Sequence, residues 1–158
     1  MALSEADTRA KLIDPALKGA DWDEAKIERE VKVTDGRLYL VGDQAHRRKP
    51  LWADYVLSWE GLPIAVVEAE DDSHHAAAGL QQAKSYAEMI DVRFAYSSNG
   101  KGFVEFDYLA NTETVLGIDD FPSPQDLVGR LDQQGAIPAV GDPILYPYDT
   151  SMGLHPRY

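Results

Sequence analysis

Two neighbouring β-rich runs constrain the fold more than any other feature of the sequence, because the second ends in concentrated negative charge. WADYVLSW (52–59) and PIAVVEAE (63–70) are separated by the glycine-containing segment Glu60-Gly61-Leu62. Two such runs joined by a short loop predict an antiparallel β-hairpin. The second run continues into Asp71-Asp72, so four carboxylates follow an apolar strand directly. A strand that ends in this way either emerges into water or faces a cation.

The length of the loop decides whether these acids meet an acid of the first run. With a three-residue loop, Asp54 lies directly opposite Glu68, on the same face of the sheet and about 5 Å away. A loop one residue shorter or longer would put the two on opposite faces. Facing carboxylates near a core cannot both stay ionised unless a cation or a proton compensates them. The first register favours a metal ion, whereas a solvated strand end is the alternative, and we expect the latter for Asp71 and Asp72.

The residue types indicate which metal such a site would take. Carboxylate oxygens are hard ligands, and the sequence contains no cysteine and no suitably spaced histidine pair. Magnesium or manganese is therefore expected rather than zinc.

The rest of the sequence predicts further helices and hairpins around this pair of runs. A serine-to-acid spacing at Ser4 predicts a helix start, and apolar residues at helical spacing mark the longest helix. The helices are expected at residues 4–13, 23–30, 73–90 and 124–131. The hairpins are expected at Asp35-Gly36, which would join EVKV to RLYLV, and at Asn99-Gly100, which would join RFAYSS to GFVEFDY.

Length and charge limit the function classes. The 158 residues correspond to one globular domain. Without cysteine, and with no apolar segment among the charged N-terminal residues, the sequence predicts a soluble protein of the reducing cytoplasm with no membrane partner. The net charge of −12 argues against a general nucleic-acid binder. One basic run, His46 to Lys49, is either a solvated loop or a phosphate contact, in which case Arg47, Arg48 and Lys49 would touch DNA.

The acids belong to a longer pattern of residues. Asp54 is followed by Glu68-Ala69-Glu70 on the next predicted strand and by Gln82-Ala83-Lys84-Ser85-Tyr86 on the predicted helix after it. This order resembles the N-terminal nuclease domain of type I restriction enzyme motor (R) subunits, in the PD-(D/E)XK nuclease superfamily. The likeness covers most of the chain: Thr8-Arg9, Leu12-Ile13-Asp14, Trp22, Glu28-Arg29-Glu30, Arg47-Arg48, Ala53-Asp54-Tyr55, Val67-Glu68-Ala69 and Ser98-Asn99-Gly100.

The resemblance implies a restriction-endonuclease-like α/β fold, with a central mixed β-sheet flanked by helices. It implies that Asp54 and Glu68 are metal ligands, and that Glu30, at the end of its helix, completes the acidic cluster. Magnesium, with manganese as a substitute, would assist the hydrolysis of a phosphodiester in double-stranded DNA. Gln82 and Tyr86 would form a further motif beside the site, and their spacing puts them on one face of a helix.

One position departs from the family pattern. The family has a lysine two residues after the glutamate, where this sequence has Glu70. A lysine there would orient the attacking water and stabilise negative charge in the transition state. Three explanations are open: Glu70 is a base or a further ligand, a lysine reaches in from elsewhere, or the site is inactive. Lys84 is a poor substitute because its helical position turns it away from Gln82, and Lys49 and Lys101 have no geometric support.

The resemblance also divides the chain and implies partners. Residues 1–132 would form the nuclease domain, and 133–158 a linker toward a helicase motor that this sequence does not contain. No Walker-type motif occurs, so ATP would act only through that motor. The other expected partners are the modification and specificity subunits. Two alternatives remain: a catalytically silent domain of the same fold that serves docking or regulation, and an unrelated acidic domain that binds a protein.

Overall fold

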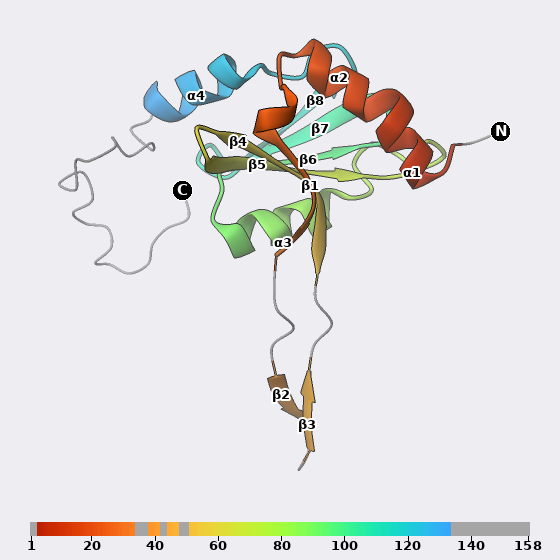
Figure 1. Ribbon diagram of the computed structural model, residues 1–158, viewed down its shortest axis with the longest axis vertical. Coiled ribbons are helices and arrows are strands. Elements are labelled where there is room, and N and C mark those ends of the chain that lie inside the picture. The colour runs from red at the N-terminus through yellow and green to blue at the C-terminus, as the bar shows by residue number, and fades with distance from the viewer. Residues whose placement is uncertain (1–2, 34–37, 42–43, 48–50, 134–158) are drawn as a thin grey trace.

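The computed structural model describes residues 3–33, 38–41, 44–47 and 51–133. Its centre is a six-stranded sheet with strand order β1-β4-β5-β6-β7-β8 (Figure 1). Neighbouring strands are antiparallel except β5 and β6, which are parallel, so the sheet is mixed. The strands are β1 (Ile27–Lys32), β4 (Trp52–Trp59), β5 (Leu62–Ala69), β6 (Phe94–Ser98), β7 (Gly102–Asp107) and β8 (Thr112–Gly117). The expected α/β class with a central mixed sheet is confirmed.

Helices cover both faces of this sheet, and each face has its own apolar core. Helix α3 (Leu80–Ile90) packs on one face over a cluster that includes Val56, Val66 and Ala95. The N-terminal helical stretch and α4 (Pro124–Gln133) pack on the other, over a cluster that includes Trp22 and Phe94 (Figure 1). In the part of the chain that the structure describes, no helix is both long and apolar enough to cross a bilayer.

The predicted three-residue loop between β4 and β5 is wrong, yet the register it implied is found. Trp59 pairs with Leu62, so the turn contains only Glu60 and Gly61, both with positive φ (50° and 82°). This is the backbone of a primed turn, which matches the twist of a hairpin. The register then shifts by one residue between Ser58 and Leu57. The turn is one residue shorter than predicted and the bulge adds one residue, so the two changes compensate each other. Tyr55 then pairs with Val67, as in the predicted register that would set Asp54 opposite Glu68.

The first helix is longer than predicted. It begins at Ser4, whose Oγ accepts from the Asp7 N–H at 3.1 Å, as the capping pattern indicates. It runs on as α1 (Glu5–Thr8), a π-helical turn η1 (Arg9–Ile13) and α2 (Asp14–Gly19). Pro15 cannot donate a backbone hydrogen bond, and the helix widens in the turn before it, where the Asp14 N–H reaches the Arg9 carbonyl.

The predicted helix over 23–30 is wrong. Only a short 3-10 turn, η2 (Glu24–Lys26), precedes β1, and the Asp23 carboxylate caps that turn. The following residues pair with β4 instead, where β-branched Ile27 lies opposite Leu57 and Val31 lies opposite Ala53. Glu30 therefore lies within a strand and not at a helix end.

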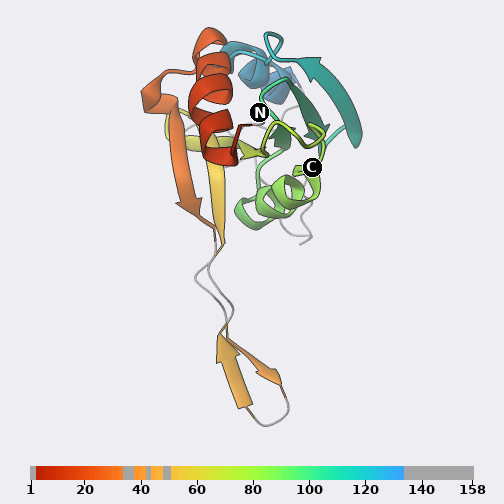
Figure 2. The ribbon, with the colours of Figure 1, turned by 90° about the vertical axis from the view of Figure 1, so that its right-hand side faces the viewer.

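The hairpin predicted between EVKV and RLYLV is also wrong. β1 pairs with β4, whereas β2 (Leu38–Val41) pairs with β3 (Gln44–Arg47) in a separate two-stranded sheet. Figure 2 shows this small sheet projecting away from the six-stranded one. The predicted turn at Asp35-Gly36 and the predicted linker over 134–158 lie outside the described residues.

The longest helix begins seven residues later than predicted, at Leu80 rather than Ser73. Local side-chain contacts compete with helix formation before it. The Asp71 carboxylate accepts from the N–H and the hydroxyl of Ser73, and His75 Nδ1 accepts from the Ala77 N–H. The hairpin at Asn99-Gly100 and the last helix are confirmed. β8 was not predicted, since it is an exposed edge strand with little apolar patterning.

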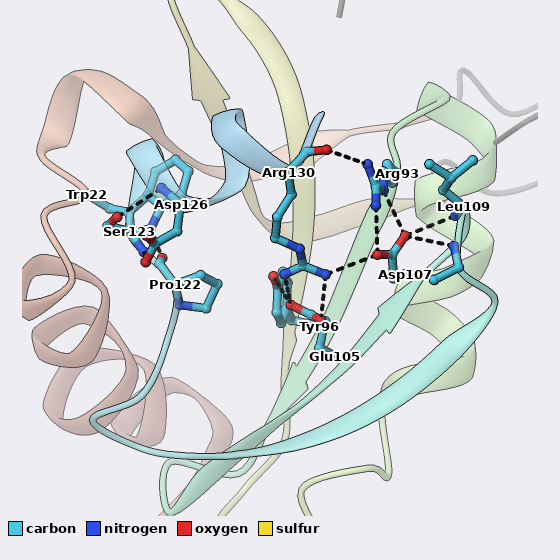
Figure 3. A network of polar contacts seen from close by, with 11 residues as sticks. Trp22, Arg93, Tyr96, Glu105, Asp107, Leu109, Pro122, Ser123, Asp126 and Arg130 are labelled. Atoms are coloured by element: carbon cyan, nitrogen blue, oxygen red, sulfur yellow. Dashed lines mark hydrogen bonds and ion pairs between the residues drawn. The ribbon is translucent and has the colours of Figure 1, made fainter. Parts of the chain in front are cut away.

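A buried polar network fastens α4 to the sheet (Figure 3). The Arg93 guanidinium binds the Asp107 carboxylate through two hydrogen bonds, of 2.7 and 2.9 Å, and donates a third to the Arg130 carbonyl. Arg130 in turn binds Glu105 through both guanidinium nitrogens and reaches Asp107 at 3.0 Å. The Tyr96 hydroxyl donates to Glu105 at 2.5 Å. Each charged group of this network is thus paired with an opposite charge, which offsets the cost of removing it from water.

Candidate functional site

The two predicted acids meet where strands β4 and β5 part. Their backbone pairing ends at Tyr55 and Val67, one step before the acids. Beyond it, the Asp54 N–H donates to Glu68 Oε2 and the Ala69 N–H donates to Asp54 Oδ2, each at 2.8 Å. Side-chain oxygens therefore replace the backbone ladder at this end of the hairpin.

Glu68 and Asp54 are brought together by hydrogen bonds across the hairpin. Alternation along β5 sets Glu68 on the side that α3 covers, since Val66, two residues earlier, belongs to the core cluster on that side. Alternation does not hold through the start of β4, where Ala53 belongs to the same cluster as Val56. The two acids are close together, as the sequence predicted, but their projection from one face of the sheet stays a prediction.

Burial raises the free-energy cost of ionising both carboxyl groups of this pair. Glu68 is 5% exposed, and desolvation together with the Asp54 charge raises the pKa of Glu68 to about 8. Burial also raises the pKa of Asp54, although the Ala69 N–H and the Arg9 guanidinium lower it. Burial and the neighbouring charge thus favour a proton on Glu68 at a pH where a solvent-exposed carboxyl group has lost it. A divalent cation can replace that proton.

Arg9 is the cation that the structure places on Asp54. Its Nη1 lies 3.6 Å from Asp54 Oδ1 and 3.4 Å from Glu30 Oε2. The Glu30 side chain is 68% exposed, and its charge adds to the forces that raise the pKa of Asp54. Glu30 has a left-handed backbone (φ 54°) within β1, a costly conformation for a residue other than glycine. Two ion pairs thus connect Glu30 to Asp54 through Arg9.

Glu70 lies next to the pair, between the loop and helix α3. Its N–H donates to the Ser98 carbonyl, and its Oε1 lies 3.6 Å from His74 Nδ1. Its other oxygen, Oε2, lies against Gly79, and a Cβ atom added to Gly79 would be only 2.8 Å from that oxygen. Glu70 is therefore held in place, and its charge contributes to raising the pKa of Glu68.

Gln82 and Tyr86 extend the site along helix α3. Gln82 Nε2 donates to the Tyr86 hydroxyl at 2.5 Å, one helical turn away. Desolvation raises the pKa of Tyr86, and the charges of Glu68 and Asp54 raise it further. The pairing expected from their spacing is present, and Tyr86 is close enough to the acids to feel their charge.

The Asn99-Gly100 hairpin positions the segments around the acids. Asn99 Nδ2 donates to the His74 carbonyl, and Ser97 Oγ accepts from the Gly79 N–H. Gly100 has φ 85° and packs directly against Thr8 and Leu12 of the N-terminal helix, where no larger residue would fit. This hairpin thus links the loop before α3 to the helix that carries Arg9.

The predicted basic contacts are only partly described. Arg47 is the last residue of β3, in the projecting two-stranded sheet, whereas Arg48 and Lys49 lie outside the described residues. The Lys84 ammonium lies over the Phe106 ring at 4.1 Å, as expected for a helix position turned away from Gln82. Lys101 is exposed and follows the Asn99-Gly100 turn.

Sequence reasoning missed two residues of the site, Arg9 and Glu5. Burial and the Asp54 charge raise the pKa of Glu5, and the Arg9 charge lowers it. A signal was present in the sequence: the two residues are four apart in the predicted first helix, which puts an acid and a base on one helical face. What the sequence could not show is that this face meets the end of β4.

The donor atoms at this site fit a magnesium-type ion held by few protein ligands. Within residues 3–33, 38–41, 44–47 and 51–133, no three acidic, histidine or cysteine side chains are grouped so that they could hold a metal ion. Magnesium commonly takes only one or two carboxylates and fills its other positions with water and substrate phosphate. Asp54, which is half-buried, and Glu68, which is buried, provide such a pair of hard oxygen donors at the ends of neighbouring strands.

Comparisons with known proteins agree on one family. No protein-family model matches the chain. The chain is 36% identical, over 99% of its length, to the endonuclease subunit of the type I restriction enzyme EcoAI from Escherichia coli, of which it spans 20%. It also matches a solved fragment described as an HsdR subunit of a type I restriction enzyme from Vibrio vulnificus, with 39% identity and a TM-score of 0.76, over 94% of this chain and 29% of that one. The chain is therefore a homologue of the endonuclease (HsdR) subunits of type I restriction enzymes, related to them over nearly all of its own length.

Proposed function

We propose that this chain is the metal-dependent nuclease domain of a type I restriction enzyme, and that it hydrolyses phosphodiester bonds in DNA. Asp54 and Glu68 would hold a magnesium ion, for which manganese can substitute. The observation that carries the proposal is the pair of carboxylates at the parted ends of β4 and β5, each of which accepts a backbone N–H from the other strand, in a chain homologous to endonuclease subunits. When bound, such an ion lowers the pKa of water and neutralises charge on the phosphate.

The neighbouring side chains would support this chemistry. Glu70 lies two residues beyond Glu68 and can accept a proton from the attacking water, as carboxylates do in general base catalysis. The Gln82-Tyr86 pair presents an amide and a hydroxyl beside the acids, and both groups can hydrogen-bond a phosphate oxygen. Glu30, which the resemblance implies as a third ligand, is ion-paired with Arg9 and would have to give up that pair to reach the ion.

Contacts to DNA would be few within this domain. With a net charge of −12, the chain repels a polyanion over most of its surface. The basic run of Arg47, Arg48 and Lys49 would supply local phosphate contacts. The helicase motor of the same subunit and the modification and specificity subunits would hold the duplex, and ATP would act through the motor.

Calorimetric titration with manganese tests the metal site. We expect Asp54→Asn to weaken manganese binding at least a hundredfold, because loss of even an outer-shell partner of a metal ligand costs tenfold to a hundredfold. Asp119→Asn, at an exposed position between β8 and α4, serves as the matched control and should bind as the parent does. A parent chain that binds no manganese at millimolar concentration would refute the metal site.

A second candidate function is a catalytically silent domain of the same fold that serves docking or regulation. The observation in its favour is Glu70, which stands where the family pattern has lysine. Under this alternative, the site can keep its shape through the Asp54 and Glu68 hydrogen bonds and yet cut nothing.

Exchange of Glu70 separates the two candidates. If Glu70 is the base, Glu70→Lys, tested in the assembled enzyme, should lower magnesium-dependent nicking by about tenfold or more. If the site has merely lost its lysine, the same variant should raise nicking by a similar factor, because a lysine there would stabilise charge in the transition state. Glu70→Gln shows how much comes from removing the negative charge alone. A fall in nicking with both variants would identify Glu70 as a working base or ligand. No nicking by the parent or by either variant would favour the silent domain.

A further inference from the structure

Asp54 divides its two oxygens between different partners. Oδ2 accepts the Ala69 N–H at 2.8 Å, whereas Oδ1 faces the Arg9 guanidinium at 3.6 Å. The oxygen not engaged by the backbone is therefore the one that Arg9 approaches. An ion bound to Asp54 would draw on the same oxygen.

Contacts to the strand that carries Asp54 hold the backbone of Arg9 in place. Arg9 opens the π-helical turn, and its carbonyl accepts the Asp14 N–H across that widened turn. The Asp14 carboxylate is itself fixed by the Tyr55 hydroxyl at 2.6 Å, from the residue after Asp54. Such turns recur at functional sites because they redirect side chains. The backbone of Arg9 is thus anchored to the strand that carries the proposed ligand.

The Arg9 guanidinium makes long contacts to its two acidic partners. Its side chain is 21% exposed, and its contacts to Glu30 and Asp54 are longer than a tight ion pair. Glu30, which is largely exposed, can keep Arg9 nearby if Arg9 leaves Asp54. Within the described residues, Arg9 is the basic residue that forms an ion pair with Asp54.

We propose that Arg9 is a positioning residue that acts as the internal counter-ion of Asp54 and that a divalent ion displaces it. This inference rests on the proposed metal site. Without the ion, Arg9 neutralises Asp54 and bridges it to Glu30 of β1. With the ion, the two positive charges repel, and Arg9 moves toward Glu30 or a substrate phosphate, which a guanidinium binds as well as it binds a carboxylate.

Manganese titration of Arg9→Gln tests the exchange. We expect this variant to bind manganese about tenfold more tightly than the parent, because a competing charge beside the ion is gone. Arg9→Lys keeps the charge and should bind close to the parent value. In EDTA, Arg9→Gln should unfold at a lower temperature than the parent, and saturating manganese should close that gap.

The outcomes separate this inference from the proposed function. If Arg9 only holds the helix in place, Arg9→Gln will unfold earlier with and without manganese and will bind the ion no more tightly, which overturns the inference. If the parent binds no manganese, the proposed metal site has failed, and the inference fails with it. Tighter binding by both Arg9→Gln and Arg9→Lys would also overturn it, because charge would not be the cause.

Discussion

Glu68→Gln is expected to stabilise the metal-free domain at alkaline pH and to abolish divalent-ion binding. The folded chain raises the pKa of Glu68 from 4.5 to about 8, through burial and the Asp54 charge. The stabilisation associated with that proton is complete below pH 4.5 and is lost as the pH rises through about 8. Above this range the parent must keep an ionised carboxylate buried, whereas the glutamine amide stays neutral.

The hydrogen bonds of the pair should survive this exchange. The amide oxygen can still accept the Asp54 N–H, and the amide nitrogen can donate to the Asp54 carboxylate. We therefore expect Glu68→Gln to raise the free energy of unfolding at pH 9 by an amount on the order of 3 kcal/mol. Near pH 4.5 the difference should vanish.

Urea denaturation in EDTA at several pH values, followed by manganese titration, measures both effects. Glu113→Gln on the exposed strand β8 is the matched control and should change neither. Equal stability of Glu68→Gln and the parent at pH 9 would contradict the raised pKa of Glu68. Retained manganese binding by Glu68→Gln would contradict its role as a ligand.

Arg93→Ala is expected to destabilise the domain by about 3–5 kcal/mol. Both Arg93 and Asp107 are 3% exposed, and the alanine would leave the Asp107 carboxylate buried with only its contacts to Arg130 and to two backbone N–H groups. The variant would also free the Arg130 carbonyl near the end of α4. Urea denaturation at neutral pH measures the loss.

A solvent-exposed arginine–carboxylate ion pair of the same chain serves as the control. Arg29 binds Glu24 through two guanidinium nitrogens at 2.8 and 3.2 Å, but this pair lies at the surface. Arg29→Ala should cost no more than about 1 kcal/mol. If Arg93→Ala lowered the free energy of unfolding no more than Arg29→Ala, burial would not be the reason that the Arg93 network stabilises the domain.

The sequence predicted the site better than it predicted the elements around it. The acids were correctly placed close together because Tyr55 pairs with Val67, as in the predicted register. The loop that set the register was nevertheless wrong, since a bulge near Ser58 compensates for a shorter turn. A bulge of one residue leaves no clear mark in the residue pattern, so this success depended on a compensation that the sequence does not display.

The misplaced elements have a common cause, which is competition from contacts that only the fold supplies. Residues 23–30 have helical composition, but pairing with β4 decides their conformation. Residues 73–79 continue the pattern of α3, yet Asp71 and His75 bind the backbone that a helix would use. Arg9 was assigned no role because its partner Asp54 is distant in sequence, and the π-helical turn that presents it depends on tertiary packing.

The reciprocal hydrogen bonds between Asp54 and the β5 strand, and between Glu68 and the β4 strand, give each acid two duties. Under the proposed function, one is to bind an ion, and the other is to hold together two strands whose own backbone ladder has stopped. A lineage that gave up cutting DNA would still need the second. Evolution could exchange these acids for amides without unravelling the hairpin, but aliphatic replacements would leave two backbone donors orphaned, so inactive descendants should carry asparagine or glutamine there.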